Sequence, residues 1–147
     1  MFAAILLALS VATAVQLAVA PDASAATCSG TRIAHKPIRA SASSTSTVIG
    51  YLDVYYNSSN GNNCARTVHA GPAEGVRRNT SVVLYRCIQV NPGNGCTLDH
   101  VVNDTGNYAY YAGPVSLWAG THCISVYGDI YWNGAYRTQS ADGFCDA

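Results

Sequence analysis

The stretch TSVVLYRCI, residues 80–88, is the most strand-like run in this chain of 147 residues. It is rich in β-branched side chains, which favour extended backbone because they pack well on a pleated surface. Tyr is abundant in the chain, with ten copies, whereas Phe and Met are almost absent. Such a composition suits short strands and turns and is poor material for long helices.

Short runs of the same kind follow one another along the rest of the chain, with Gly, Pro and Asn between them. They occupy residues 48–56, 64–69, 98–102, 108–111, 115–118, 123–127 and 130–138. Within the last run, Asn133-Gly134 is the two-residue signal of a β-hairpin. No window of about ten residues after residue 25 has a helical hydrophobic period. We therefore expect an all-β fold, a single small disulfide-bonded β-sandwich or barrel of about seven to nine short antiparallel strands.

The charge balance limits the classes of partner. Eight Lys and Arg residues stand against eight Asp and Glu residues, and the formal net charge is 0. A nucleic-acid-binding protein needs a basic face that neutralises phosphates, so we expect no nucleic-acid partner.

The beginning of the chain has the pattern of an export signal. Residues 2–20 carry no charge, and Ala23-Ser24-Ala25 is an A-x-A cleavage site. We predict that residues 1–25 are a cleaved signal peptide, which makes the protein secreted and extracellular. The alternative, a membrane anchor, is less favoured because small Ala and Thr residues dilute the apolar stretch and a cleavage site follows it. Residues 26–47 are then an N-terminal arm or edge strand with a Ser/Thr-rich linker, and residues 48–147 form the β-domain.

The cysteines fit an oxidising compartment. All six follow the cleavage site, and an even number in an exported domain indicates three disulfides. The turn chemistry of Pro92-Gly93-Asn94-Gly95 brings Cys87 and Cys96 side by side, so we pair them. For the others we favour nearest neighbours in sequence, and no C-x-x-C motif points to zinc. The predicted disulfide residues are Cys28 with Cys64, Cys87 with Cys96, and Cys123 with Cys145.

Catalytic chemistry has few candidates in the sequence. The four histidines are scattered, and neither H-E-x-x-H nor G-x-S-x-G occurs. The aspartates at strand ends and turns are typical turn formers rather than the paired carboxylates of a hydrolase. We expect no catalytic residue, no cofactor and no metal, and hence a protein that is not an enzyme.

Aromatic side chains are the candidate interaction surface. Where two aromatic residues are consecutive on a strand, one of them points away from a core on one side of the sheet. Tyr and Trp also dominate binding hot spots. The alternative is that tyrosines fill the core, because Phe144 is the only Phe after residue 25. The candidate interaction residues are Tyr55, Tyr56, Tyr108, Tyr110, Tyr111, Trp118, Tyr131 and Trp132.

Three stretches carry a resemblance to a known family. GYLDVYYNSSNGNNCARTV (residues 50–68), DTGNYAYYAGPVSLWAGTHCISVYGDI (residues 104–130) and the leader followed by ATCSG (residues 26–30) resemble the actinobacterial secreted spore-associated protein A family. The resemblance implies a small exported β-domain found outside the cell or on spores, and it brings no catalytic residues. The pair Cys87 and Cys96 departs from the family pattern and suggests a locally stapled hairpin. A weaker similarity is to small bridging subunits of secreted antibacterial particles.

Together these observations predict a secreted, non-enzymatic spore- or cell-surface-associated protein that acts by protein–protein interaction. Its partner is expected to be another secreted or cell-surface protein, bound through the aromatic strands or through residues 33–39 added to the edge of a partner's sheet. One alternative is an adaptor subunit of a secreted antibacterial multiprotein particle. Another is a protease inhibitor, because residues 87–96 form a disulfide-braced loop.

Overall fold

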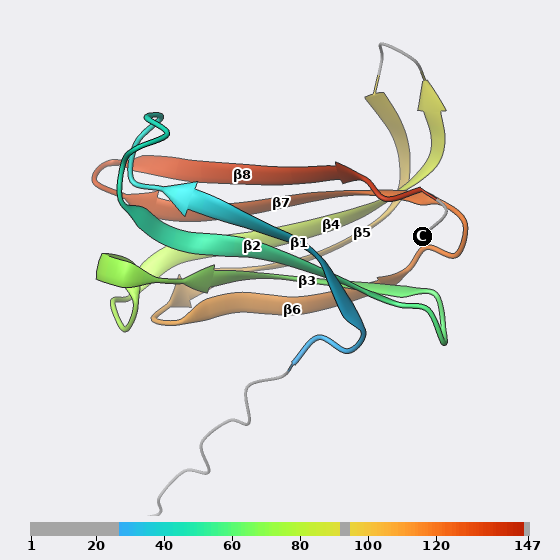
Figure 1. Ribbon diagram of the computed structural model, residues 1–147, viewed down its shortest axis with the longest axis horizontal. Coiled ribbons are helices and arrows are strands. Elements are labelled where there is room, and N and C mark those ends of the chain that lie inside the picture. Colours follow the sequence, from blue (N-terminus) through green and yellow to red (C-terminus); the bar gives the residue numbers. More distant parts are fainter. Residues whose placement is uncertain (1–26, 92–94, 146–147) are drawn as a thin grey trace, which may run out of the picture.

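The computed structural model describes residues 27–91 and 95–145, and most of this part of the chain is β-strand (Figure 1). The predicted signal peptide and residues 92–94 of the Cys87–Cys96 turn lie outside the described residues. The elements are β1 (Thr31–Arg39), β2 (Val48–Asn57), β3 (Asn62–His69), the 3-10 turn η1 (Gly71–Ala73), β4 (Arg78–Asn91), β5 (Gly95–Tyr108), β6 (Tyr111–Trp118), β7 (Cys123–Trp132) and β8 (Ala135–Gly143). The prediction of a small all-β fold is confirmed.

The strands form two antiparallel four-stranded sheets. The first sheet has the order β1-β2-β3-β6 and the second has the order β5-β4-β7-β8. Figure 1 views the molecule from the side of β1 and β2. Several hydrogen bonds join the sheets. Among them, Thr67 Oγ1 donates to the Ser81 carbonyl oxygen at 2.8 Å, and Gln139 Nε2 donates to the Pro37 carbonyl oxygen at 3.0 Å. The second of these bonds connects β8 to β1, the edge strand formed within residues 26–47.

The core lies between the two sheets. Strand alternation turns every second side chain inward, and the inward positions are apolar and almost fully buried. Removing these side chains from water is the main stabilising contribution to such a fold. The largest fully buried apolar residues are Ile38, Ile49, Leu52, Leu84, Ile124, Ile130, Val54, Val82 and Val126.

The connection between β7 and β8 confirms the hairpin signal. Asn133 and Gly134 have φ values of 48° and 84°, so both central residues are left-handed, as a type I′ turn requires. The turn places Tyr131 opposite Tyr136 in the register.

Residues 108–111, by contrast, are not the strand that the sequence predicts. β5 ends at Tyr108 and β6 begins at Tyr111, so Ala109 and Tyr110 form the turn between the sheets. The carbonyl oxygen of Ala109 accepts from the Gly75 amide, and that of Tyr110 accepts from the His69 amide. An aromatic run favours extended backbone, but here the chain must cross from one sheet to the other, and these bonds to other segments stabilise the crossing.

The three disulfides join the predicted partners: Cys28–Cys64, Cys87–Cys96 and Cys123–Cys145. They are compatible with an extracellular location. Within residues 27–91 and 95–145, no helix has the length and apolar character needed to cross a membrane.

Candidate binding surfaces

The eight aromatic residues singled out in the sequence do not form one patch. Tyr55 and Tyr56 lie on β2, Tyr131 and Trp132 end β7, and Trp118 ends β6. Tyr110 and Trp118 are the most exposed of the eight, at 59% and 53%. Only Tyr108, Tyr110 and Tyr111 come together, beside Arg77 in a shallow depression of about 320 Å³.

An arginine guanidinium group lies over each of three of these aromatic rings. Arg66 lies 5.6 Å from the Tyr55 ring centre, Arg78 lies 5.1 Å from that of Trp132, and Arg86 lies 5.8 Å from that of Trp118. Cation–π contacts of this kind are attractive and directional. They orient the rings on the surface.

Tyr108 is tied into the β5–β6 turn. Its hydroxyl donates to Asp104 Oδ1 at 2.6 Å, and Asp104 Oδ2 accepts from the Gly113 amide at 2.7 Å. The hydrogen bond to Asp104 raises the pKa of Tyr108, because ionisation would place two negative charges side by side. Tyr108 therefore has a structural role at this turn.

A pronounced hollow lies on the outer face of the second sheet. Its volume is about 670 Å³. We call it the tyrosine hollow, because two tyrosines of neighbouring strands meet in it. It is lined by Tyr85, Cys87, Cys96, Leu98, Cys123, Ile124, Ser125, Tyr127, Asp142, Gly143 and Cys145.

Exposed apolar side chains gather at this hollow. Leu98 and Tyr127 line it and are 48% and 40% exposed. Val101 lies opposite the lining residue Tyr85 in the register and is 52% exposed. A contiguous apolar surface of this kind is unusual on a protein that has no partner.

Covalent and aromatic contacts make the walls of the hollow rigid. The Cys87–Cys96 and Cys123–Cys145 disulfides both line it. They are neighbours, because Cys87 on β4 lies opposite Cys123 on β7 in the strand register. The rings of Tyr85 and Tyr127 meet edge to face with their centres 6.0 Å apart. Sequence reasoning missed Tyr85 and Tyr127, because 42 residues separate them and only the strand order makes them neighbours.

Hydroxyl and carboxyl groups continue the same face beyond the hollow. Ser125 Oγ donates to Asp142 Oδ1 at the rim. Further along, Ser81 Oγ and Thr138 Oγ1 donate to the two oxygens of Asp129 at 2.9 and 2.5 Å. These bonds fix the carboxylates in place.

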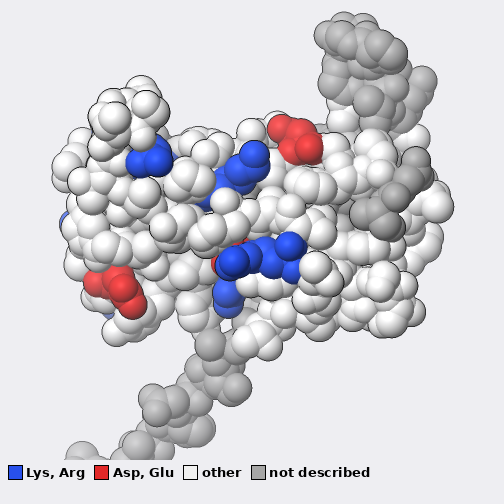
Figure 2. All heavy atoms as spheres, viewed as in Figure 1, with Lys and Arg blue, Asp and Glu red and all other residues white. Residues whose placement is uncertain are grey.

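The outer face of the first sheet has a different character. Asp53 on β2 is buried, with 4% of its side chain exposed, and three basic residues surround its carboxylate. His35 Nδ1 lies 2.6 Å from Oδ1, Arg32 Nη1 lies 3.6 Å from Oδ1, and Arg66 Nη2 lies 3.4 Å from Oδ2. We call Arg32, His35, Asp53 and Arg66 the arginine cluster. Figure 2 shows basic atoms gathered over the middle of this face.

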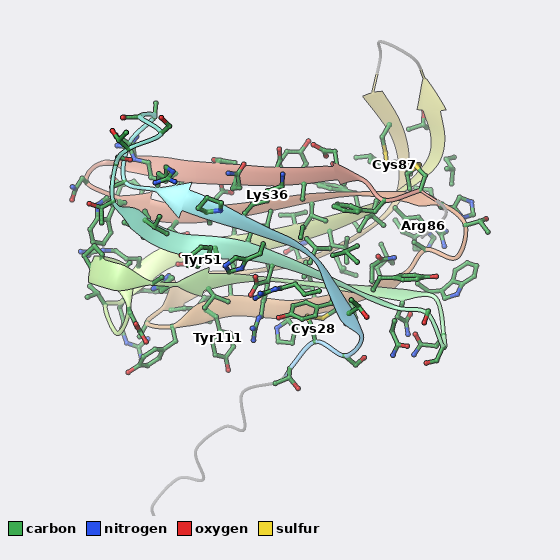
Figure 3. The ribbon with its side chains drawn as sticks, in the orientation of Figure 1. Cys28, Lys36, Tyr51, Arg86, Cys87 and Tyr111 are labelled. Atoms are coloured by element: carbon green, nitrogen blue, oxygen red, sulfur yellow. A yellow bond between two sulfur atoms is a disulfide. The ribbon has the colours of Figure 1, made fainter. Side chains whose placement is uncertain are left out.

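Two tyrosine rings contact residues of the arginine cluster. The His35 imidazole stacks on the Tyr51 ring, with centres 4.1 Å apart and planes 13° apart (Figure 3). The Tyr55 hydroxyl accepts from Arg66 Nη2 at 3.2 Å. Tyr55 is thus the one predicted interaction residue that belongs to this group.

A second ion pair lies where β6 ends. Arg86 makes a two-point hydrogen bond to Asp99, with distances of 3.0 and 2.5 Å, and donates to the Trp118 carbonyl oxygen at 3.3 Å. The bond to Arg86 holds the pKa of Asp99 well below its ordinary value, and the same bond raises the pKa of Arg86. This pair fixes the position of the exposed Trp118.

His69 is a buried structural residue. Its Nδ1 lies 3.1 Å from the carbonyl oxygens of both Ala73 and Ala109, so this nitrogen carries the proton, and Nε2 lies 2.7 Å from the Thr80 hydroxyl oxygen. Burial lowers the pKa of His69, against the effect of these bonds. Its neutral imidazole links β3 to η1, to β4 and to the β5–β6 turn.

No group of three or more His, Cys, Asp or Glu in the described ranges is arranged to hold a metal ion. Comparisons with protein-family models, with curated proteins and with solved structures find no match to this chain.

Proposed function

We propose that this protein is a secreted, non-enzymatic surface protein that binds another secreted or cell-surface protein, and that the tyrosine hollow is the binding site. The observation that supports this most directly is a set of exposed apolar side chains at a rigid hollow: Leu98 and Tyr127 line it, and Val101 lies opposite its lining residue Tyr85. Apolar patches of this kind mark interaction sites on soluble proteins.

The size and chemistry of the hollow suit an anchoring side chain of a partner. Its volume of about 670 Å³ lies within the range of ligand pockets, roughly 300–1,000 Å³. Anchors in protein interfaces are large apolar or aromatic side chains that fill such pockets. Of the described lining residues only Asp142 is charged, so a partner group next to the anchor would carry a hydroxyl or a positive charge.

The rigid walls favour binding in a second way. Association costs free energy when loops and side chains become ordered. Two disulfides and the Tyr85–Tyr127 contact have already ordered this surface. The resemblance to exported spore-associated proteins and the three disulfides support an extracellular partner, whether on a spore, on a cell surface or in a secreted multiprotein particle.

The test compares two variants for one bound partner. The protein is purified from the culture supernatant of its native host by size exclusion, cross-linked, and its partner is identified by mass spectrometry. The double variant Leu98→Asp/Val101→Asp places charge beside the hollow at two exposed positions, and Tyr110→Ser is the matched control at an exposed aromatic far from it. We expect the double variant to bind the identified partner at least about tenfold more weakly, and Tyr110→Ser to bind as the wild type.

Intact mass with all three disulfides formed shows that each variant is folded. Equal retention of the partner by the double variant and the wild type would overturn the assignment of the hollow. Elution of the wild type as a lone monomer at every concentration would overturn the proposed function itself.

A further inference from the structure

We propose that the arginine cluster on the outer face of the first sheet binds an oxyanion, a phosphate or carboxylate group of a ligand, between Arg32, His35 and Arg66. This site is on the opposite face from the tyrosine hollow and does not depend on a protein partner.

The two guanidinium groups have donors to spare. Each carries five N–H groups in a planar fork. Arg66 uses Nη2 for both Asp53 and Tyr55, while its Nε is buried and has no hydrogen-bond partner within the described residues. Arg32 lies 3.6 Å from Asp53, which is longer than a charge-assisted hydrogen bond, and 47% of its side chain is exposed. An oxyanion would supply acceptors for the N–H groups of the exposed Arg32 guanidinium.

The cluster also carries more positive than negative charge. Arg32 and Arg66 are two permanent cations, and Asp53 is the one carboxylate among them. His35 adds a third positive charge when it is protonated. Because Asp53 lies beneath the basic groups, it orients them but leaves their outer sides facing solvent. The result is a site of net positive charge on a low-dielectric sheet, where attraction for an anion exceeds that in bulk water.

A backbone irregularity brings two of these residues together. Arg32 and His35 are three positions apart, and a regular strand would turn them to opposite faces. A register shift between Arg32 and Ala34 inserts Ile33, so that both side chains reach Asp53. Bulges beside functional sites re-aim side chains in this way. Arg66 needs no such shift, because it lies directly opposite Asp53 in the regular pairing of β2 with β3.

Stacking then reduces the cost of binding. His35 lies on Tyr51, and the Arg66 guanidinium lies over the Tyr55 ring. Groups held in place before the ligand arrives lose little conformational freedom when it binds. Two arginines in fixed positions suit the paired oxygens of a phosphate or a carboxylate.

The experiment titrates the folded protein with sodium phosphate, sodium acetate and a polyphosphate chain at constant ionic strength, set with chloride. Binding is followed by NMR signals of His35, Arg32 and Arg66 and by calorimetry. Variants Arg32→Gln and Arg66→Gln each remove one cation, Arg66→Lys keeps the charge and removes the fork, and Arg77→Gln is the control at a distant exposed arginine. Arg32→Gln removes a largely exposed side chain with one long contact, so this variant remains a test even if Arg66→Gln does not fold.

We expect phosphate or acetate to shift the signals of the cluster, and Arg32→Gln and Arg66→Gln each to weaken binding by about tenfold. Arg66→Lys should bind with intermediate affinity, and Arg77→Gln should bind as the wild type. Polyphosphate and free phosphate are compared at the same concentration of phosphate groups. Much tighter binding of polyphosphate identifies the ligand as a polymeric anion, whereas equal affinity identifies it as a small anion. The proposal is overturned if about 50 mM anion, a millimolar-affinity threshold, leaves these signals unchanged, or if Arg77→Gln weakens binding as much as Arg32→Gln.

Discussion

On the outer face of the first sheet, Arg32, His35 and Arg66 surround the buried carboxylate of Asp53. On the outer face of the second sheet, tyrosines, hydroxyls and two disulfides surround a hollow, and Asp142 is the one charged residue among its described lining residues. Both faces belong to antiparallel sheets of four strands. The inward positions of both sheets are apolar because they share one core. Outward positions are free of that constraint, so a single sandwich can present two unrelated chemistries. The predictions below test how independent the two faces are.

The largest expected effects on the free energy of unfolding come from removing either of two disulfides, one beside each face. Cys28–Cys64 closes a separation of 36 residues beside Tyr55, and Cys87–Cys96 closes 9 residues at the hollow. In the loop-closure model, replacing the first pair by serines lowers the free energy of unfolding by about 4 kcal/mol and replacing the second by about 3 kcal/mol. Denaturant unfolding of the two double variants measures both values, and a larger loss for the shorter loop would contradict this order.

The next largest effect is the loss of stability when a carboxylate on either face is replaced by an amide. Asp53 is buried and accepts from charged groups, so Asp53→Asn should lower the free energy of unfolding by about 2 kcal/mol. Asp129 accepts from the two neutral hydroxyls of Ser81 and Thr138, so Asp129→Asn should cost only about 1 kcal/mol. Urea unfolding at neutral pH measures the difference. Equal losses would mean that the basic groups around Asp53 add nothing to its hydrogen bonds.

A smaller effect depends on pH and should lower the stability of both sheets together, because His69 links strands of the two sheets. Burial lowers the pKa of His69 in the folded protein, whereas the unfolded chain takes up this proton near its ordinary pKa of about 6.5. Protons then favour the unfolded state, so stability is complete above about pH 6.5 and is lost as the pH falls toward the folded-state pKa. Urea midpoints between pH 8 and 5, with NMR titration of the His69 ring, test this. A His69 ring that titrates at or above pH 6.5 would refute it.

The smallest effect is confined to the surface at the end of β6. Arg86 lowers the pKa of Asp99, so this pair contributes stability above the ordinary Asp pKa of about 3.9, and the contribution is lost as the pH falls through the lowered value. In Arg86→Gln the pKa of Asp99 should rise toward its ordinary value, with little change in stability at pH 7, because the pair is exposed to solvent. NMR titration of the Asp99 carboxyl carbon measures the pKa. An unchanged value would show that Arg86 is not its cause.

The fold was largely predictable from the sequence because its signals are local. The β-branched run in residues 80–88 and the Asn133-Gly134 turn act over a few neighbouring residues, and pairing each cysteine with its nearest neighbour in sequence was enough to predict the disulfides. The structure confirms the strands and the three pairs. The β5–β6 turn was not predictable, because its stabilising bonds come from His69 and Gly75 in other segments.

The two candidate surfaces depend on longer-range features. Period-two alternation places Arg32 and His35 on opposite faces, and only the extra residue Ile33 in β1 brings them together. Tyr85 and Tyr127 meet because β4 pairs with β7, which no spacing in the sequence reveals. A search for consecutive aromatic residues therefore found Tyr55 beside one surface and missed the tyrosines of the other.

The two outermost disulfides have a consequence for how the domain opens. Cys28 precedes β1 and is bonded to β3, and Cys145 follows β8 and is bonded to β7. Chain ends are normally where fraying and proteolytic digestion begin. Here neither the first strand nor the last can peel away without carrying a neighbour with it, so an exopeptidase would stop at a covalent crosslink from either direction. Opening must begin between the sheets, and the domain would lose its structure as one unit.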